Sequence, residues 1–510
     1  MARTKPANRR FPKWAYAVLV ISLCVVSRLP QLLSPSLFLD GDECILGLMA
    51  KHTAEAKEIP LYLLGQNYGL ASIEAGAGAL SFLLLGVGAV PLKIAMLALW
   101  GAGVVFFFLA FAALLGDAGG FLASALLIFL PAWASHSMKA WGGYVTAFTC
   151  SAIIIYLIVR FKDRPRNGVS LLLGGLTSLV FLAQPLWLPA LLPFVLFYFL
   201  SRRMVVRFIF WFLGIAGVAC FVKLISLAKP PAIWTHPPFV LDRGIFGALL
   251  ALPERVYAHL TGSYYLWGPA ASGPATKLAA FFWAVLIFGA VFVQIYRLVK
   301  KEHNSWSLLF FLSMLLTLPG AVLPTPDWGP RYLLPLSGFL AGWVAIEISD
   351  GMRRGRGWRR AASAVLVLLI LSGAGSMIEF GNQTSTAWRP SAGPTEVERM
   401  NALIEYLKSH AVRNVFSMHS MLQWQVIFYS REEILARWQS DRERYPPYID
   451  GINTAYRNGE KTALLGYSPQ ADLVRRLVDD PKSVVRVADG YFVFLNPSEN
   501  MLRKLGFTLR

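Results

Sequence analysis

The sequence predicts an all-α polytopic membrane protein that carries a small α/β domain at its C-terminal end. The 510 residues are 56% hydrophobic and only 15% charged, whereas soluble proteins carry about 25% charged residues. Apolar runs of about 20 residues, the length of a membrane-spanning helix, recur over 1–379. Beyond that point the composition becomes more polar, and helix-like and strand-like patterns alternate. We therefore expect a transmembrane domain over 1–379 and a soluble α/β domain over 380–510.

The first apolar run, 14–33, follows a basic N-terminal segment. A cleaved signal peptide is the alternative, but the run is long for a signal peptide and no small-residue cleavage site follows it cleanly. We therefore expect an uncleaved first helix. Arg9, Arg10 and Lys13 precede the run, and basic residues beside a span favour the cytoplasmic side. The acidic residues that follow the run then lie on the outer side.

Basic clusters between the apolar runs predict the rest of the topology. The formal net charge of +19 would also suit a nucleic-acid-binding protein, but most of the basic residues lie in short clusters that separate apolar runs. That arrangement is typical of the cytoplasmic loops of membrane proteins, so no nucleic-acid partner is expected. The clusters lie at 160–166, 201–207, 297–301 and 353–360.

One apolar run cannot cross the membrane if all of these clusters are cytoplasmic. The weakest run is 70–90, because it contains Glu74 and several glycines and follows a polar stretch. We expect a re-entrant or juxtamembrane helix there, which is tolerated at membrane depth where protein covers it. About eleven crossings remain, and the C-terminal domain lies outside. The expected spans are 14–33, 92–114, 120–136, 143–160, 168–184, 186–200, 207–226, 276–297, 305–323, 331–349 and 360–378.

The C-terminal domain shows the patterns of a small α/β fold. Residues 394–410 have helical spacing, 412–418 are a strand candidate, and 469–480 are again helical. Two β-like runs, 483–487 and 491–495, are separated by a turn sequence. The sequence of this domain contains no glycine-rich phosphate loop, CxxC motif or nucleophile elbow. The expected role is packing on the outer loops or helping to hold an acceptor.

Three carboxylates, Asp40, Asp42 and Glu43, lie close together after the first span. Asp40 as an N-cap residue with Glu43 three residues later matches a capping box, which explains two of the acids without any functional role. It does not explain Asp42. The apolar residues that follow, and the polar ones from Lys51 onward, indicate a short helix at the membrane interface.

This arrangement resembles the GT-C superfamily of membrane glycosyltransferases, in particular the branch of protein O-mannosyltransferases and aminoarabinose transferases (glycosyltransferase family 39-like). The resemblance rests on the first span, the outer "DE" pair, the interfacial helix and the "GQNYG" stretch. It implies a polyprenyl-phosphate sugar as donor, an acceptor hydroxyl on the outer side and an inverting displacement. The catalytic acid of the family corresponds to Asp42, with Glu43 as its partner. Such a carboxylate acts as general base on the acceptor hydroxyl.

A departing lipid phosphate needs cationic donors near the outer side of the membrane. Lys139, together with His136, is one candidate in the connection between two spans. Arg331 with Tyr332 is another, because the family commonly has an Arg-Tyr pair that enters a late span from outside. The alternative for each is an ordinary interfacial anchor, whose long side chain extends to the headgroups.

The sequence departs from the family near Lys139. The family often carries a further carboxylate there, but no Asp or Glu occurs between Phe121 and Arg160. A divalent cation would therefore lack its second carboxylate, and the histidines show no metal-ligand spacing. We therefore assign no metal ligands and no certain cofactor; a divalent cation stays an open alternative that no second carboxylate supports, and phosphate binding suits Lys139 better.

Further residues are candidates for contacts with the sugar or the acceptor. Gln66 and Tyr68 carry hydrogen-bonding groups in the "GQNYG" stretch. Glu74 is an acid within an apolar stretch, which by default indicates function, although an interfacial salt bridge would also explain it. His236 and Tyr264 belong to a second long outer loop, where aromatic residues are equally expected at the membrane interface.

A lipid or glycolipid transporter or flippase is the alternative to an enzyme, and a non-catalytic scaffold is a third hypothesis. The sequence shows no paired inverted repeats and few charges in mid-span. Its polar residues gather at the outer ends of the spans, which favours chemistry at one face. The expected partners are the lipid donor, membrane lipids and an acceptor that is a lipid, a polysaccharide or a protein. The short loops favour a bacterial inner membrane, with the N-terminus in the cytoplasm.

Overall fold

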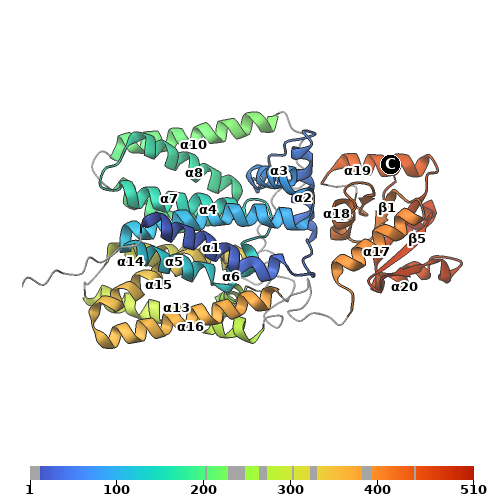
Figure 1. The fold of residues 1–510 in the computed structure, drawn as a ribbon. Helices are drawn as coiled ribbons and strands as arrows, with labels where there is room; N and C mark the ends of the chain where they lie inside the picture. Colours follow the sequence, from blue (N-terminus) through green and yellow to red (C-terminus); the bar gives the residue numbers. More distant parts are fainter. Residues whose placement is uncertain are drawn as a thin grey trace, which may run out of the picture.

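Long helices run side by side through most of the chain, and the C-terminal domain lies at one end of them (Figure 1). Two shorter helices, α2 (Gly41–Ala54) and α3 (Ser72–Leu85), lie at that end of the bundle, beside the C-terminal domain. The computed structural model describes residues 12–200, 204–227, 247, 249–262, 273–300, 304–321, 330–381, 393–440 and 444–509.

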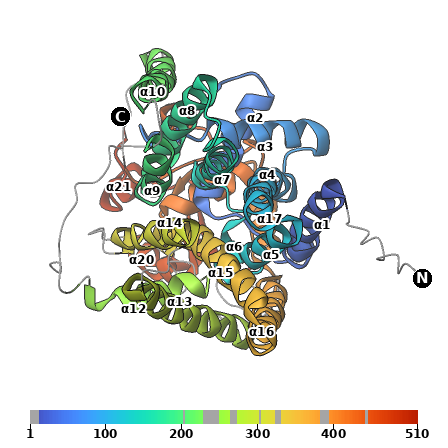
Figure 2. The ribbon, with the colours of Figure 1, turned by 90° about the vertical axis from the view of Figure 1, so that its left-hand side faces the viewer.

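The bundle is built from apolar helices that pack on neighbours in sequence, such as α4 on α5, and on more distant helices, such as α8 on α10, α4 on α7 and α13 on α16. Figure 2 looks along this bundle. Among the described residues, seven helices are long and apolar enough to cross a membrane, and shorter apolar helices accompany them. The chain is therefore a multi-pass membrane protein. The bundle helices are α1 (Lys13–Leu32), α4 (Ala89–Leu115), α5 (Asp117–Ile128), α7 (Tyr144–Phe161), α8 (Asn167–Ala183), α9 (Leu188–Phe199), α10 (Met204–Leu227), α13 (Pro274–Lys300), α14 (Ser305–Leu315), α15 (Leu334–Arg354) and α16 (Arg356–Gly381).

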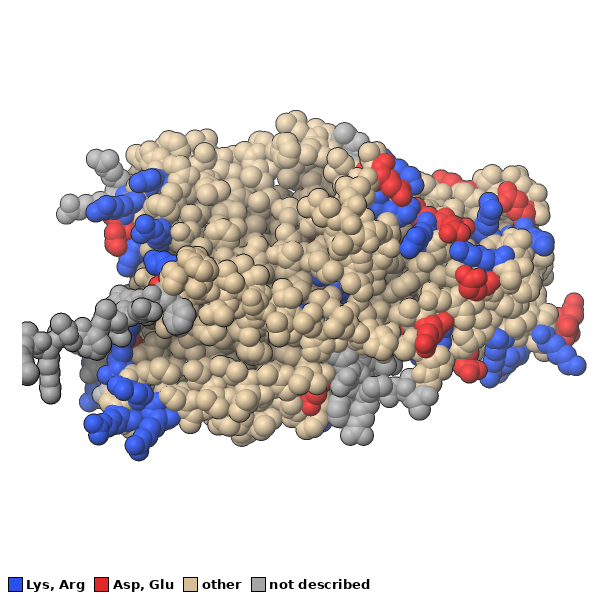
Figure 3. Space-filling model, viewed as in Figure 1, with Lys and Arg blue, Asp and Glu red and all other residues tan. Residues whose placement is uncertain are grey.

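Charge is distributed unevenly along the bundle. On the face drawn in Figure 3, lysine and arginine side chains gather at the end away from the C-terminal domain, and the middle carries almost no charge. Large apolar side chains, among them Phe212, Phe288 and Leu371, are exposed on the bundle surface. This distribution is typical of helices that cross a hydrocarbon layer and carry their basic loops on one side.

Two expected spans are shorter in the structure. The expected span 120–136 consists of two helices, α5 and the short α6 (Pro131–His136). The break falls before Pro131, because proline has no N–H to donate and its ring disfavours a helical conformation at the preceding residue. The expected span 305–323 is also shorter, since α14 ends at Leu315. The run 70–90, which was expected not to cross the membrane, contains α3, one of the shorter apolar helices. Its re-entrant or juxtamembrane placement stays a prediction.

The C-terminal domain contains a five-stranded sheet of order β2-β1-β3-β5-β4. β1 pairs in parallel with β2 and β3, and β5 pairs antiparallel with β3 and β4. The expected first helix and the three expected strands are confirmed as α17, β1, β4 and β5, whereas β2 and β3 were not predicted. The elements are α17 (Glu396–Ser409), β1 (Asn414–Ser417), α18 (Ser420–Tyr429), β2 (Leu435–Arg437), α19 (Pro446–Arg457), β3 (Thr462–Tyr467), α20 (Ala471–Arg475), β4 (Val485–Val487), β5 (Tyr491–Leu495) and α21 (Glu499–Lys504).

Helix α2 connects the bundle to the C-terminal domain. It packs on α3 and also on α18, and buried apolar residues from all three helices belong to one core cluster. The approach of α18 depends on Gly47, because a Cβ there would come within 2.4 Å of the Phe428 ring. The short helix expected after the acidic cluster is therefore present, and the C-terminal domain packs on it. Its location at the membrane interface stays a prediction.

A polar contact fixes the end of α2. The Glu432 carboxylate accepts a hydrogen bond from Lys51 Nζ and another from the Tyr448 hydroxyl at 2.7 Å. His52 Nε2 lies 2.8 Å from Glu432 Oε1. Lys51 also pairs with Glu55 at 2.9 Å. Bonds of this kind, in which a partner is charged, are roughly twice as strong as neutral ones, so this contact holds the C-terminal domain against α2.

Candidate active site

The start of α2 is closed by the capping box that the sequence predicts. The Asp40 side chain accepts a hydrogen bond from the Glu43 backbone N–H at 2.9 Å, and the Glu43 carboxylate accepts one from the Asp40 N–H at 3.4 Å. The structural explanation of these two acids is therefore confirmed. Both carboxylates also have partners outside α2.

Two lysines neutralise the capping acids. Glu43 is fully buried and forms an ion pair with Lys93 at the start of α4. Lys139 Nζ lies 3.1 Å from Glu43 Oε2 and 3.1 Å from Asp40 Oδ2. The Trp141 indole N–H donates to Asp40 Oδ2 at 3.0 Å. Burial alone would raise the pKa of Asp40, but Lys139 and the Glu43 N–H outweigh it and hold that pKa at about 2.

Asp42 faces a different set of residues. Its Oδ1 lies 3.5 Å from Nη1 of Arg444, a residue of the C-terminal domain. Burial raises the pKa of Asp42, and the neighbouring Asp40 adds to the rise, while Arg444 and Arg331 oppose it. Asp42, which takes no part in the capping box, therefore has a raised pKa. A general base works best when its pKa lies near the working pH.

Arg331 enters the same region from the 3-10 turn η4 (Pro330–Leu333) before α15. Its guanidinium carbon lies 5.4 Å from the ring centre of Trp141 and 5.1 Å from that of Tyr332, and it hydrogen-bonds with Tyr144. Stacking on aromatic rings holds a guanidinium in place while its N–H groups remain able to bind a phosphate. Arg331 is close enough to Asp42 to affect its pKa, and Tyr332 lies beside Arg331.

His136 is placed differently. It is almost completely buried, and its Nδ1 lies 2.8 Å from the Ala132 carbonyl oxygen and 2.7 Å from Ser135 Oγ. Its ring meets Trp141 edge-on at 5.4 Å between ring centres. His136 thus packs behind the residues that face Asp42, and the Lys139 side chain remains 22% exposed on the site. Phosphate binding by either residue stays a prediction.

The stretch 65–69 lies beside the site, where Gly65 packs against Arg444. Tyr68 is close enough to Asp42, Arg331 and Arg444 to feel their charges, although burial is the main reason that its pKa is raised. Gln66 is half-buried in the same turn. The left-handed backbone of Gly65, with a φ of 74°, makes this tight turn accessible at no steric cost.

The other predicted contact residues are not gathered at Asp42. Glu74 is fully buried, and its Oε1 accepts hydrogen bonds from the backbone N–H groups of Val145 and Thr146 at 3.1 and 3.2 Å. It therefore serves the first turn of α7, and a contact with sugar stays a prediction. His236 and Tyr264 lie outside the described residues.

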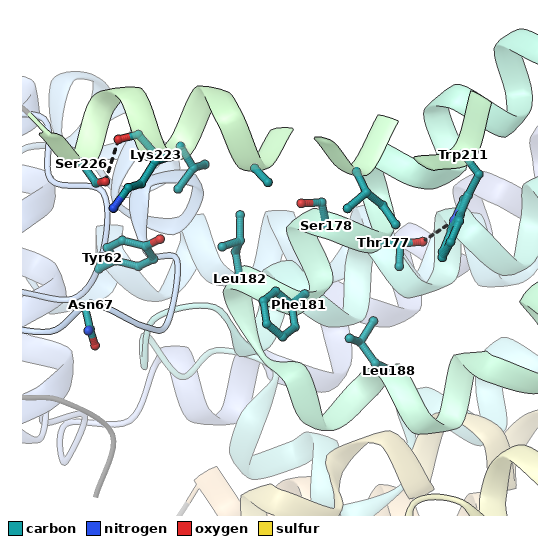
Figure 4. Close-up of a pocket in the computed structure, with 13 residues that line it drawn as sticks. Tyr62, Asn67, Thr177, Ser178, Phe181, Leu182, Leu188, Trp211, Lys223 and Ser226 are labelled. Atoms are coloured by element: carbon teal, nitrogen blue, oxygen red, sulfur yellow. Dashed lines mark hydrogen bonds between the residues drawn. The ribbon is translucent and has the colours of Figure 1, made fainter. Parts of the chain in front are cut away.

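An apolar groove of about 600 Å³ opens between α8 and α10. Figure 4 shows Thr177 and Trp211 toward one end of it, and Tyr62, Asn67 and Lys223 around the other. The second end is its polar mouth. Asn67 lines this mouth and its neighbour in sequence, Tyr68, lies near Asp42, so a single turn of chain links the groove to the acid cluster.

The acids at the start of α2 are paired with cationic side chains. In the part of the chain that the structure describes, no group of three or more His, Cys, Asp or Glu side chains is arranged to hold a metal ion. The three acids at the start of α2 are engaged with Lys93, Lys139 and Arg444.

Comparison with known proteins identifies the fold. No sequence-family profile matches the chain, and no curated protein matches it by sequence. The structure is similar to ArnT from Cupriavidus metallidurans bound to undecaprenyl phosphate, with a TM-score of 0.59 and 11% identity over 95% of this chain and 98% of that chain. The comparison with ArnT in the apo state has a TM-score of 0.58 and 13% identity, and it covers the same 95% and 98% of the two chains. The chain has the GT-C fold. Another GT-C protein is the Archaeoglobus fulgidus oligosaccharyltransferase in complex with Zn and sulfate. Its comparison has a TM-score of 0.50 and 9% identity, and it covers 89% of this chain and 68% of that chain.

Three residues of this candidate site were not predicted. Lys93 lies in the first turns of a long apolar helix, and a lysine inside an apolar run is the signal that would have pointed to it. Trp141 lies two residues after Lys139, in a stretch that was already a candidate. Arg444 belongs to a domain whose sequence carries no catalytic motif, and only the docking of that domain on α2 reveals it.

Proposed function

We propose that the protein is a membrane glycosyltransferase that moves a sugar from a polyprenyl-phosphate donor to an acceptor hydroxyl, with Asp42 as the general base. One observation carries the proposal. Asp42 is a carboxylate with a raised pKa that faces Arg331 and Arg444, while its neighbours Asp40 and Glu43 are neutralised by lysines. A base and guanidinium groups therefore occupy one site at the end of the bundle.

Asp42 and Arg331 are placed to accept the proton and to stabilise the leaving group of the transfer reaction. The acceptor oxygen attacks the anomeric carbon of the sugar, and its proton passes to the Asp42 carboxylate. The bond between the anomeric carbon and the phosphate oxygen breaks, and the electron pair leaves with the polyprenyl phosphate. Arg331 is placed to stabilise the phosphate charge with its planar N–H groups, and Lys139 is a second candidate. Direct displacement inverts the anomeric configuration.

The groove between α8 and α10 suits the lipid part of the donor. Its walls are apolar, and it opens sideways on α8 and α10, which lie together at one edge of the bundle (Figure 2). The polar mouth near Lys223 would hold the headgroup end, and the 65–69 turn would bring the sugar toward Asp42. The resemblance to an ArnT structure bound to undecaprenyl phosphate supports a donor of this class.

Orientation follows from the distribution of charge. Basic residues gather at the bundle end away from the C-terminal domain (Figure 3), and such an end faces the cytoplasm. The C-terminal domain and Asp42 then lie on the outer side of a bacterial inner membrane. The acceptor, whether lipid, polysaccharide or protein, reaches Asp42 from that side.

The test is to follow the sugar of a radiolabelled donor. Purified protein in vesicles is given undecaprenyl-phosphate hexose or pentose, together with a membrane extract of the source organism as acceptor. A transferase moves the label to a product and releases undecaprenyl phosphate. A flippase moves the labelled lipid between leaflets and leaves the sugar attached. If the label stays on undecaprenyl phosphate with every donor, the proposal is wrong.

A further inference from the structure

Arg444 brings a charge from the C-terminal domain into the site of the membrane domain. It lies just before α19, and its Nη1 is 3.5 Å from Asp42 Oδ1. The Arg444 and Asp42 side chains are only 20% and 27% exposed, so solvent screens this ion pair less than it screens an exposed one. The contact therefore links the two domains at the residue proposed as the base.

The backbone of Arg444 is held in place from two directions. On the membrane-domain side, Gly65 packs directly against it, because a Cβ on Gly65 would come within 2.6 Å of the Arg444 Cα. On the other side, the ring of Tyr445 lies 5.6 Å from that of His52. Arg444 is therefore held at the domain interface, between the 65–69 turn and the end of α2.

The charged and titratable groups found around Asp42 come from several elements. Asp40 and Glu43 come from α2 itself, Arg331 from η4, Tyr68 from the 65–69 turn and Tyr144 from α7. Burial and the two acids disfavour an ionised Asp42, whereas the two arginines favour it. Arg331 is also the candidate for the phosphate, whereas Arg444 is the cation whose ion pair with Asp42 comes from the C-terminal domain.

We propose that Arg444 is a positioning residue for Asp42, so that docking of the C-terminal domain completes the active site of the membrane domain. This inference rests on the proposed function of Asp42. The guanidinium holds the carboxylate in its ionised form and oriented toward the acceptor hydroxyl. A membrane domain whose C-terminal domain has moved away from α2 retains the donor groove but has a weaker base.

The decisive variants are Arg444→Gln and Arg444→Lys in the full-length protein. Loss of the positive charge raises the pKa of Asp42, so the acid limb of the pH-rate profile moves to higher pH. When that limb moves by about one pH unit, the ionised fraction of Asp42 at a given acidic pH falls about tenfold. The donor KM stays at the wild-type value because the groove is unchanged, and kcat falls. Arg444→Lys restores the position of the acid limb in part.

A second substitution perturbs Arg444 from the membrane domain. Gly65→Ala displaces the Arg444 backbone without removing its charge, and it is expected to move the acid limb in the same direction as Arg444→Gln. Arg475→Gln is the matched control, because Arg475 belongs to the same domain but pairs with Asp472 at 2.8 Å on the exposed surface. It is expected to leave the profile unchanged.

A direct titration keeps this inference separate from the proposed function. The infrared absorption of the Asp42 carboxyl group, obtained as the difference between wild type and Asp42→Asn, reports its protonation without any substrate. A rise of the titration midpoint in Arg444→Gln supports the inference even if no sugar transfer is found, in which case only the proposed function fails. Unchanged midpoints and unchanged pH profiles in Arg444→Gln overturn the inference while leaving a transferase intact.

Discussion

Lys139 Nζ lies 3.1 Å from Asp40 Oδ2, which joins the connection before α7 to the first residue of the α2 cap. This ion pair divides the acidic cluster into two parts. Asp40 and Glu43 hold α2 in place, with Lys139 and Lys93 as their partners. Asp42 is left to face Arg331 and Arg444. The division leads to different expectations for substitutions at adjacent positions.

Asp42→Asn is expected to lower the rate of sugar transfer by at least about 100-fold, because general-base catalysis contributes roughly 10²–10⁴-fold and an amide cannot accept the proton. The shape of the side chain is conserved, so the melting temperature in detergent should change little. Asp117→Asn, at the start of α5, is the matched control and should transfer sugar at the wild-type rate. A variant Asp42→Asn with near wild-type activity would falsify the assignment.

Lys93→Met is expected to destabilise the fold strongly, since it removes a cation from the fully buried Glu43. Breaking one partner of a buried ion pair costs about 3–5 kcal/mol, and the loss here falls at the lower end because Lys139 remains beside Glu43. The double variant Glu43→Gln/Lys93→Met should lose much less than the sum of the single variants, because the two residues are coupled. Unfolding in detergent measures this cycle, with the exposed Lys57→Met as control. Strictly additive losses would contradict the pairing.

Local patterns made the acidic cluster predictable. The capping box is defined by four consecutive residues, so its geometry follows from the sequence around Asp40. The long helices followed from apolar runs, and the break before Pro131 followed a rule that hydropathy averaging hides. β2 and β3 were missed because short buried strands in a mixed sheet show no alternating pattern.

The rest of the site depends on contacts between distant segments. Arg331 was found because it sits in an Arg-Tyr pair at the start of a span, and the structure places it beside Asp42. The sequence around Arg444 contains no comparable motif, and the position of Arg444 depends on how the C-terminal domain docks against Gly65 and α2. A residue whose function comes from domain packing has no local sequence pattern to reveal it.

Glu432→Gln is expected to weaken the attachment of the C-terminal domain in a pH-dependent way. Burial opposes ionisation of Glu432, but His52, Lys51 and Tyr448 outweigh it and lower the pKa from 4.5 to about 2. A lowered pKa contributes stability that is present above about pH 4.5 and is lost as the pH falls toward 2. The melting temperature of the variant should therefore lie below that of wild type at pH 7, and the gap should narrow between pH 4.5 and 2.

The control for that experiment is the next residue along the chain. Glu433 is 63% exposed and pairs with Lys408 at 3.1 Å, and surface pairs contribute little. Glu433→Gln should thus melt close to wild type at every pH. A gap between Glu432→Gln and wild type that persists unchanged at pH 2 would show that the contact does not depend on the charge of Glu432.

Ala219→Trp tests the groove between α8 and α10. Ala219 lines the groove, so an indole ring there occupies space that the proposed lipid chain needs. The KM for the polyprenyl-phosphate donor should rise by about tenfold, which corresponds to about 1.4 kcal/mol of binding. Because Asp42 and Arg331 are untouched, kcat at saturating donor should stay near wild type.

Cys220→Trp is the control for this groove variant. Cys220 is exposed on the same helix and is not among the groove residues, so the donor KM of Cys220→Trp should not change. An equal rise in both variants, or in neither, would mean that the donor chain lies elsewhere on the bundle.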